Sequence, residues 1–287
     1  MADISRRGLD SEAIRKFVVV AEELHFGRAA LRLGIAQPPL SRAISQLERR
    51  LGAALLERNS RAVTLTEAGS VLLREGRAAL DAIEAADRRT RRAATGKASV
   101  VLVAKAGASS ETLAKLLDAY AAEPDAVTVD VLLCGVGEQE RLLRDGRADV
   151  GLLHRPFDST VGFDSEDLLT EGQVLVLPAG HPLTTRTDLR MADVTGLPGL
   201  PRPRWPGPDG TYPDGPGPEV RDTSQLMQLI ALGRASAVLP ESCRAQLRDD
   251  LVAVPVLEAP AVTTVIAWPP HSRSRAVAGL VRAATRL

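Results

Sequence analysis

The chain has 287 residues, of which 45% are hydrophobic, so its length and composition suggest about two domains with cores of their own. No run approaches the ~18 apolar residues of a membrane span, and the charged first ten residues lack the apolar segment of a signal peptide; we therefore expect a cytoplasmic protein without a membrane segment. The net charge of zero hides an asymmetry, because residues 1–97 carry 18 basic and 12 acidic side chains and residues 98–287 carry 18 and 24. A basic N-terminal part fits a phosphate-binding surface, whereas the acidic remainder would be repelled by DNA.

The first predicted helix runs from Ser11 to Leu24, with Ser11 placed to cap its start. Its apolar residues recur at helical spacing: Ile14, Phe17, Val18 and Ala21. A short helix over 28–33 follows, and residues 34–36 form a tight connection to the next helix. Two helices joined in this way predict a helix-turn-helix.

The next helix begins near Gln37, because Pro38 and Pro39 suit a first turn, where their missing N–H groups would have no intrahelical partner. One face is an apolar stripe at steps of four, three and four: Leu40, Ile44, Leu47 and Leu51. The outward positions on the opposite face are Pro38, Arg42, Ser45 and Arg49, with Ser41 and Gln46 on its flanks. We expect the first face to be buried and the second to contact DNA.

Two short strands are predicted directly after this helix, over 55–58 and 62–65. Between them lies the turn-forming group Asn59-Ser60-Arg61, which carries an arginine at its tip. A hairpin here would form the wing of a winged helix-turn-helix.

The spacing of these residues resembles that of LysR-type transcriptional regulators over about sixty residues. The shared residues are Ala29-Ala30, Leu33, Gln37-Pro38-Pro39-Leu40-Ser41, Leu47-Glu48, Leu51-Gly52, Glu57-Arg58 and Thr64-Leu65-Thr66-Glu67-Ala68-Gly69. The resemblance implies an all-α winged helix-turn-helix that binds double-stranded DNA at a dyad operator. Phosphate contacts, or for Arg42 a base contact, are expected from Arg42, Arg49, Arg58 and Arg61. The other expected DNA contacts are Gln37, Pro38, Pro39, Ser41 and Ser45.

Residues 67–97 are predicted to form a linker between the DNA-binding domain, 1–66, and the rest of the chain. Thr66 can cap a helix from Glu67 to about Arg92, which would span roughly 40 Å. One side of this helix is mostly small and apolar: Ala68, Leu72, Ala79, Ala82, Ile83 and Ala86. The seam and the family resemblance imply a homodimer or homotetramer, while a single solvated arginine-rich helix remains the alternative.

From residue 98 the pattern changes to alternating strands and helices, which predicts a largely parallel sheet covered by helices. Strands are expected over 99–104, 127–134 and 148–153, and helices over 111–122 and 139–145. Residues 146–151 and 175–183 resemble the family's effector-binding domain. The implied fold for 98–287 is two Rossmann-like subdomains, as in periplasmic binding proteins: 98–168 with 264–287, and 169–263.

The second subdomain contains a proline- and glycine-rich run over 196–218 that cannot be regular structure. This loop is either a cover over a ligand cleft or a variable excursion on the surface. A helix over 224–232, a strand over 237–239 and the start of a further helix at 240–242 are predicted after it.

A small-molecule effector is implied between the subdomains, with an organic acid as one option. Ser109 and Ser110 lie at the start of the 111–122 helix, where they either bind an anion or cap the helix. Ungapped alignment places Val136 at a commonly polar contact and Gly107 at the family's usual serine. Arg202 and Arg204 either pair with a carboxylate or remain solvated.

Other functions have weaker support in the sequence. Gly135-Val136-Gly137 lacks the third glycine of a dinucleotide site, so we expect no cofactor. The four histidines show no metal-ligand spacing. Cys134 and Cys243 are read as buried thiols, with a redox-responsive regulator as the alternative. No nucleophile, base and orienting acid are recognisable as a set, which argues against an enzyme. RNA polymerase is a further partner that the sequence neither indicates nor excludes.

Overall fold

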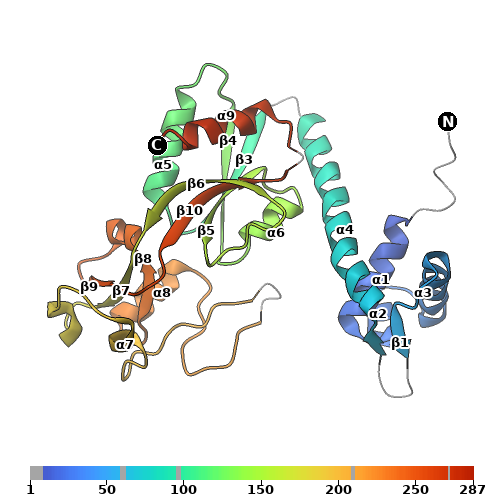
Figure 1. Ribbon diagram of the computed structural model, residues 1–287, viewed down its shortest axis with the longest axis horizontal. Coiled ribbons are helices and arrows are strands. Elements are labelled where there is room, and N and C mark those ends of the chain that lie inside the picture. The colour runs from blue at the N-terminus through green and yellow to red at the C-terminus, as the bar shows by residue number, and fades with distance from the viewer. Residues whose placement is uncertain (1–8, 59–62, 95–97, 208–210, 271) are drawn as a thin grey trace. The chain divides into compact units, whose positions relative to one another are not determined.

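The computed structural model describes residues 9–58, 63–94, 98–207, 211–270 and 272–287. The chain divides into two compact units, residues 1–90 and 91–287 (Figure 1). Within the described residues, no helix is long and apolar enough to cross a membrane.

The N-terminal unit is built on helices α1 (Ser11–Glu23), α2 (Phe26–Leu33) and α3 (Gln37–Leu51). Their apolar faces meet in one core, in which the largest fully buried side chains are Phe17, Leu40, Ile44, Leu47 and Leu55. The expected start of α3 at Gln37 is confirmed, with prolines in its first turn. The core therefore leaves the opposite face of α3 toward solvent.

Three local expectations in this unit are wrong. Helix α1 is capped by Asp10, whose carboxylate accepts the N–H of Ala13 at 2.7 Å, and not by Ser11. Helix α2 starts two residues earlier than expected because the His25 ring accepts the N–H groups of Gly27 and Arg28. Leu51 is 40% exposed, since it is the last residue of α3.

The wing strands are β1 (Leu56–Arg58) and β2 (Val63–Leu65), which pair antiparallel. Glu48 of α3 fixes the start of the hairpin, because one of its carboxylate oxygens accepts the N–H groups of Leu55 and Leu56 at 3.0 and 3.2 Å. The expected arginine at the tip, Arg61, lies outside the described residues.

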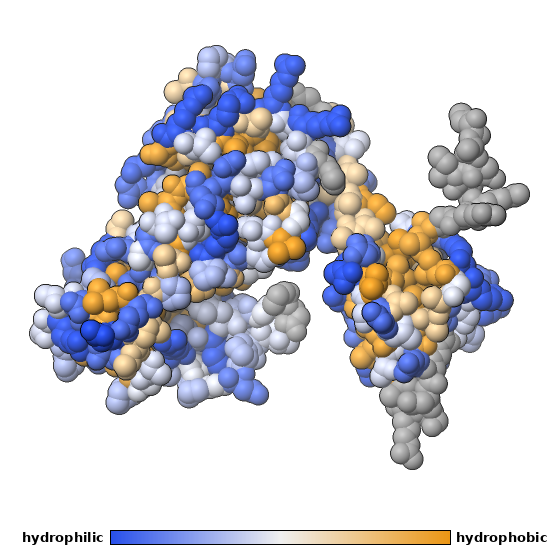
Figure 2. All heavy atoms as spheres, viewed as in Figure 1, coloured by the Kyte–Doolittle hydropathy of each residue, from blue (hydrophilic) through white to orange (hydrophobic). Residues whose placement is uncertain are grey.

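Helix α4 (Glu67–Ala94) has 28 residues and is capped by the Thr66 hydroxyl, as expected. Leu72 packs into the core of the N-terminal unit and does not contribute to an exposed seam. Val71 and Ile83 of α4 are 44% and 48% exposed, and apolar side chains gather on this unit where α1 and α4 meet (Figure 2). The helix therefore presents apolar surface that its own unit does not cover.

The first sheet of the second unit has the order β4-β3-β5-β10-β6. Its strands are β3 (Ser99–Lys105), β4 (Thr128–Cys134), β5 (Val150–Arg155), β6 (Asp164–Glu171) and β10 (Val262–Trp268). Strand β3 pairs parallel with β4 and β5, as predicted, and β10 pairs antiparallel with β5 and β6. Helices α5 (Ser110–Ala121) and α9 (Arg275–Ala284) cover one face, and α6 (Gln139–Arg144) covers the other.

The second sheet has the order β8-β7-β9, with antiparallel pairing throughout. Its strands are β7 (Gln173–Pro178), β8 (Ala237–Pro240) and β9 (Leu251–Val256). The helical elements around it are α7 (Met191–Val194), α8 (Thr223–Ala231) and the 3₁₀ helices η1 (Pro182–Thr185) and η2 (Glu241–Gln246). The helix expected to start at 240–242 is thus a 3₁₀ turn.

The chain passes between the two sheets from β6 to β7 and from β9 to β10. These passages lie side by side, because β6 and β10 are neighbours in the first sheet. The hydroxyl groups of Thr170 and Thr263 are 2.9 Å apart, and the Gln173 amide donates to the carbonyl oxygen of Pro260 at 2.8 Å. The two passages are therefore bonded to each other.

Candidate functional sites

The outward face of α3 contains most of the residues expected to contact DNA. Gln37, Pro38, Pro39, Arg42 and Arg49 are exposed. Ser41 and Ser45 are half-buried and line one shallow hollow with the two arginines. Arg58 ends strand β1, and its side chain and all of Arg61 lie outside the description.

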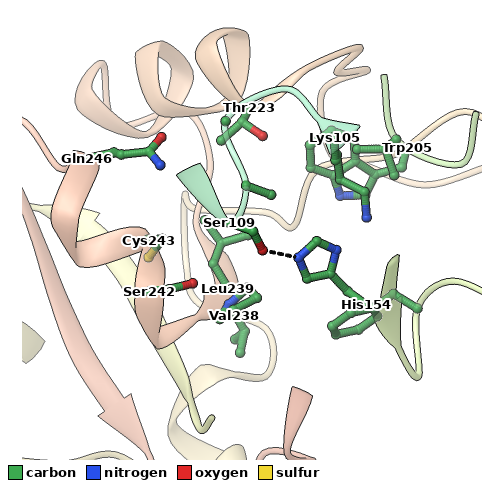
Figure 3. A pocket seen from close by; sticks show the side chains of 15 residues that line it. Lys105, Ser109, His154, Trp205, Thr223, Val238, Leu239, Ser242, Cys243 and Gln246 are labelled. Carbon is green, nitrogen blue, oxygen red and sulfur yellow. Dashed lines mark hydrogen bonds between the residues drawn. The ribbon is translucent and has the colours of Figure 1, made fainter. Parts of the chain in front are cut away.

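A cavity of about 180 Å³ lies between the two sheets of the second unit (Figure 3). Lys105 and His154 come from the carboxyl ends of the neighbouring parallel strands β3 and β5, the edge where open sheets of this kind bind ligands. The second sheet supplies the opposite wall. The remaining lining residues are Gly107, Ala108, Ser109, Val136, Phe157, Trp205, Thr223, Val238, Leu239, Pro240, Ser242, Cys243 and Gln246.

Lys105 brings a positive charge to the lining of the cavity, and the carboxylate of Asp158 balances this charge. Its Nζ donates to both carboxylate oxygens of Asp158 at 3.2 Å, and the two side chains are 12% and 5% exposed. Burial raises the pKa of Asp158, but contacts with His154 and the charge of Lys105 outweigh it and hold the pKa below its usual value. Asp158 is therefore ionised at neutral pH.

Ser109 and His154 form the central polar pair of the cavity. The Ser109 hydroxyl oxygen lies 2.7 Å from Nε2 of His154, and both residues are buried. Nδ1 of His154 has no hydrogen-bond partner among the described residues, since Asp158 Oδ2 is 3.6 Å away. The serine, histidine and aspartate of a hydrolytic triad are thus close together, but the aspartate binds the His154 backbone N–H and Lys105, so it does not orient the imidazole as a triad requires.

The other polar lining side chains are bound to neighbouring parts of the chain. The hydroxyl of Thr223 donates to the carbonyl oxygen of Ala106 at 3.1 Å, and that of Ser242 donates to Glu171 at 2.9 Å. The Gln246 amide donates to the Ser110 hydroxyl at 2.8 Å. Thr223 and Gln246 therefore join the second subdomain to the first across the cavity.

A glycine is required at residue 107. Its φ of +75° favours glycine, and a Cβ there would lie 2.9 Å from Cβ of Thr223. Thr223, at the start of the facing helix α8, therefore fills the space that a side chain at residue 107 would need.

The residues predicted to bind an effector separate into two groups. Ser109 and Val136 line the cavity, whereas Ser110 lines a neighbouring hollow. Arg202 is exposed and does not line the cavity. Arg204 does not line it either, because its guanidinium binds the carbonyl oxygens of Gly217 and Pro213 and the carboxylate of Glu219.

Two further sequence expectations change at this site. Ser109 precedes α5 in a left-handed conformation at φ 51°, and its side chain makes no capping hydrogen bond because it is paired with His154. The proline-rich loop contributes Trp205 to the cavity wall, which favours the covering role over a plain surface excursion. Lys105 and His154 were missed, although both could be found as polar residues where predicted parallel strands end.

Two family models match the chain. The model described as bacterial regulatory helix-turn-helix protein, lysR family, matches residues 11–70, and the LysR substrate binding domain model matches residues 94–287. The chain belongs to the LysR family of transcriptional regulators. It is a DNA-binding regulator of this type, with the N-terminal helix-turn-helix, long helix and C-terminal α/β domain of the family.

Relatives of this LysR-family chain include other bacterial regulators. The uncharacterized HTH-type transcriptional regulator YnfL of Escherichia coli is 31% identical over 277 residues, which cover 90% of this chain and 91% of YnfL. AlsR of Bacillus subtilis is 35% identical over 186 residues, or 64% of this chain and 61% of AlsR. The crystal structure of CbnR, a LysR family regulator, has a TM-score of 0.56 at 24% identity and covers 97% of this chain and 99% of CbnR.

The two cysteines of this LysR regulator are free thiols, and Cys243 lines the cavity. Burial raises the pKa of Cys134 to about 12 and that of Cys243 to about 11. The thiolate is the form that reacts with oxidants and alkylating agents. Both environments therefore oppose the reactivity that a redox-responsive regulator needs.

Alkylation of Cys243 by iodoacetamide is expected to be on the order of 100-fold slower in the native chain than in the unfolded chain at pH 8. The reason is that a pKa above the working pH leaves little thiolate. The native rate should rise about tenfold per pH unit between pH 8 and 10. Mass spectrometry of a Cys134→Ala variant would follow this thiol alone, and equal native and unfolded rates would contradict the assignment.

Proposed function

We propose that this regulator binds a dyad operator as a homodimer or homotetramer and that a small molecule in the cavity controls the bound arrangement. One observation carries the DNA part: α3 buries Leu40, Ile44 and Leu47 while Arg42 and Arg49 on its other side stay exposed. A helix held in this way can place its first turns in a major groove. The expected contacts are those named from the sequence, from Gln37 to Arg61.

Self-association is supported by the uncovered apolar side chains of α4. Val71 and Ile83 are large exposed hydrophobic residues on a 28-residue helix, and burying them against a second copy removes apolar surface from water. We assign residues 67–97 to this linker, residues 1–66 to DNA binding and residues 98–287 to effector binding.

The control step is supported by the position of the cavity. Its two walls belong to different sheets, so a ligand between them interacts differently with open and closed arrangements of the subdomains. Such a difference in affinity is what allows a ligand to shift a conformational equilibrium. We infer that this shift alters how the DNA-bound copies are set relative to one another.

The test is a footprint of the full chain on its own upstream intergenic DNA over a salt series. Protection of a dyad and an adjacent second site, weakened steeply by salt, is the expected result. A ligand that shortens or shifts the protected region would support the control step. An unprotected region at low salt would overturn the DNA assignment.

If Arg42 contacts a base, replacing it with alanine should weaken operator binding by about 1–3 kcal/mol and relax specificity at one base pair. Binding titrations against the operator and its single-base variants would measure both effects.

The matched control is Arg50→Ala, which removes the same charge from the same helix. Arg50 pairs with Asp10 at 3.0 Å, so we expect a smaller loss that is the same for every operator variant. If Arg42→Ala and Arg50→Ala behave alike across the variants, Arg42 does not read a base.

A further inference from the structure

We infer that the cavity selects an uncharged molecule with a single aromatic ring, in place of the organic acid considered from the sequence. This inference rests on the proposed effector function and narrows it to a ligand class. Four observations carry it: the size of the cavity, its aromatic walls, its internal charge balance, and the small number of polar groups that remain available to a ligand.

The size of the cavity suits one ring. A closed apolar cavity of about 150 Å³ is enough to hold benzene, and this cavity measures about 180 Å³. The difference leaves room for a small substituent on that ring.

Aromatic side chains are rare in this chain, and the cavity uses two of them. The sequence has two tryptophans and four phenylalanines, and Trp205 and Phe157 both line the cavity. Phe157 is 58% exposed, which places it at the mouth, and Trp205 comes from the proline-rich loop. Aromatic side chains on two sides can stack on a flat ring or meet its edge.

The charge balance opposes a carboxylate. Among the described lining residues, Lys105 is the only lysine, and there is no arginine. The Nζ of Lys105 already binds both carboxylate oxygens of Asp158. A carboxylate entering the cavity would lose its water and would meet a cation that is already neutralised, so its desolvation would not be offset.

The start of α5 does not supply the missing attraction within the cavity. Free N–H groups at a helix start favour anions, but Ser110, Glu111 and Thr112 line the neighbouring hollow. Glu111 and Lys115 also line that hollow and pair at 2.7 Å, so their charges balance each other there.

Among the described lining side chains, Ser109 and His154 form the buried polar pair that we expect a ligand to meet. Thr223, Ser242 and Gln246 already donate to protein acceptors. The ionised Asp158 lies 3.6 Å from Nδ1 of His154 and favours a proton there, so Nε2 accepts the Ser109 hydroxyl proton, and the serine oxygen can accept a hydrogen bond from the ligand. A neutral hydrogen bond from a hydroxyl or amide substituent of the ligand to the Ser109 oxygen adds to the recognition.

The test compares isosteric pairs that differ in charge. Calorimetric titration of the full chain at pH 7.5 would use benzamide against benzoate, with salicylamide against salicylate as a second pair. We expect each amide to bind at least tenfold more tightly than its acid, and we expect bound amide to quench Trp205 fluorescence in a Trp268→Phe variant. An acid that binds as tightly as its amide, or more tightly, would overturn the inference.

The outcomes separate this inference from the proposed function. A chain that binds an acid in this cavity and shifts its footprint keeps the effector function and loses only the ligand class. A chain that binds neither member of either pair overturns the aromatic class. Loss of any footprint response to ligands would count against the proposed function itself.

Replacing Asp158 with asparagine tests whether the charge balance of Lys105 causes the preference for an uncharged ligand. In Asp158→Asn the charge of Lys105 is no longer balanced, so the ratio of benzamide to benzoate affinity should fall at least tenfold. Asp167→Asn is the control, because Asp167 pairs with Arg155 on the surface and does not line the cavity. An unchanged affinity ratio in a folded Asp158→Asn chain would contradict the charge argument. If that variant does not fold, the amide and acid affinities of the wild-type chain decide whether the inference holds.

Discussion

Replacing Lys105 with methionine should lower the free energy of unfolding of the C-terminal unit by about 3–5 kcal/mol, because it leaves the carboxylate of Asp158 buried without its partner. The Asp158 side chain is 5% exposed, so water cannot compensate for the lost charge. Both tryptophans, Trp205 and Trp268, belong to this unit, and their fluorescence in a denaturant titration would measure the change.

The pH dependence has a defined sign. In the wild-type chain the pKa of Asp158 lies below its usual value, so its contribution to stability is present above the unfolded pKa and is lost as the pH falls through the folded pKa. Without Lys105, burial would raise the pKa of Asp158. The difference in the free energy of unfolding between the variant and the wild type should therefore shrink as the pH falls from 7 toward 5.

The matched control is Lys115→Met, which breaks the exposed pair with Glu111 and should leave the stability nearly unchanged. A Lys105→Met chain as stable as this control at pH 7 would show that Asp158 does not depend on Lys105.

Replacing Gly69 with alanine should destabilise the N-terminal unit by about 3 kcal/mol, even though alanine favours a helix over glycine by about 1 kcal/mol. A Cβ at Gly69 would lie 2.0 Å from the carbonyl oxygen of Leu55, a backbone atom that accepts the N–H of Thr66 at 3.1 Å. The wing segment would have to move away from α4. Hydrogen exchange of α3 peptides in the full chain would measure the loss.

Gly76→Ala provides the comparison, since it gives the same helix the same gain in propensity. Its Cβ would meet a methyl group of Ile14 at 2.9 Å, and a side chain can turn aside where a backbone carbonyl cannot. We expect a change of about 1 kcal/mol or less in either direction. Equal effects of the two alanines would refute the close approach at Leu55.

The N-terminal unit was largely predictable because its rules act over short distances. Two prolines fix the start of α3, and a repeat of four, three and four fixes its buried face. The same rules failed at Leu51, where the helix ends before the core can cover the side chain. They also failed at α2, since a histidine cap at residue 25 is uncommon.

The position of the cavity was predictable from the sequence, but most of its lining residues were not. Ser109 was predicted from its place at the start of a helix, and Val136 from the alignment with the family. The partner of Ser109 lies 45 residues away on another strand, and Asp158 follows in a loop, so only the order of strands in the sheet brings these groups together. Trp205 comes from a segment without periodicity, and no repeat could assign it to a wall.

The paired passages between the two sheets limit how the cavity can open. Two strands that are hydrogen-bonded to each other bend easily across their flat face and resist shear and twist within it. We therefore expect the β7–β9 sheet to rotate mainly about one axis that runs across β6 and β10. The ring proposed above would set a single angle about that axis, so ligands of graded thickness should yield a graded series of angles rather than unrelated conformations.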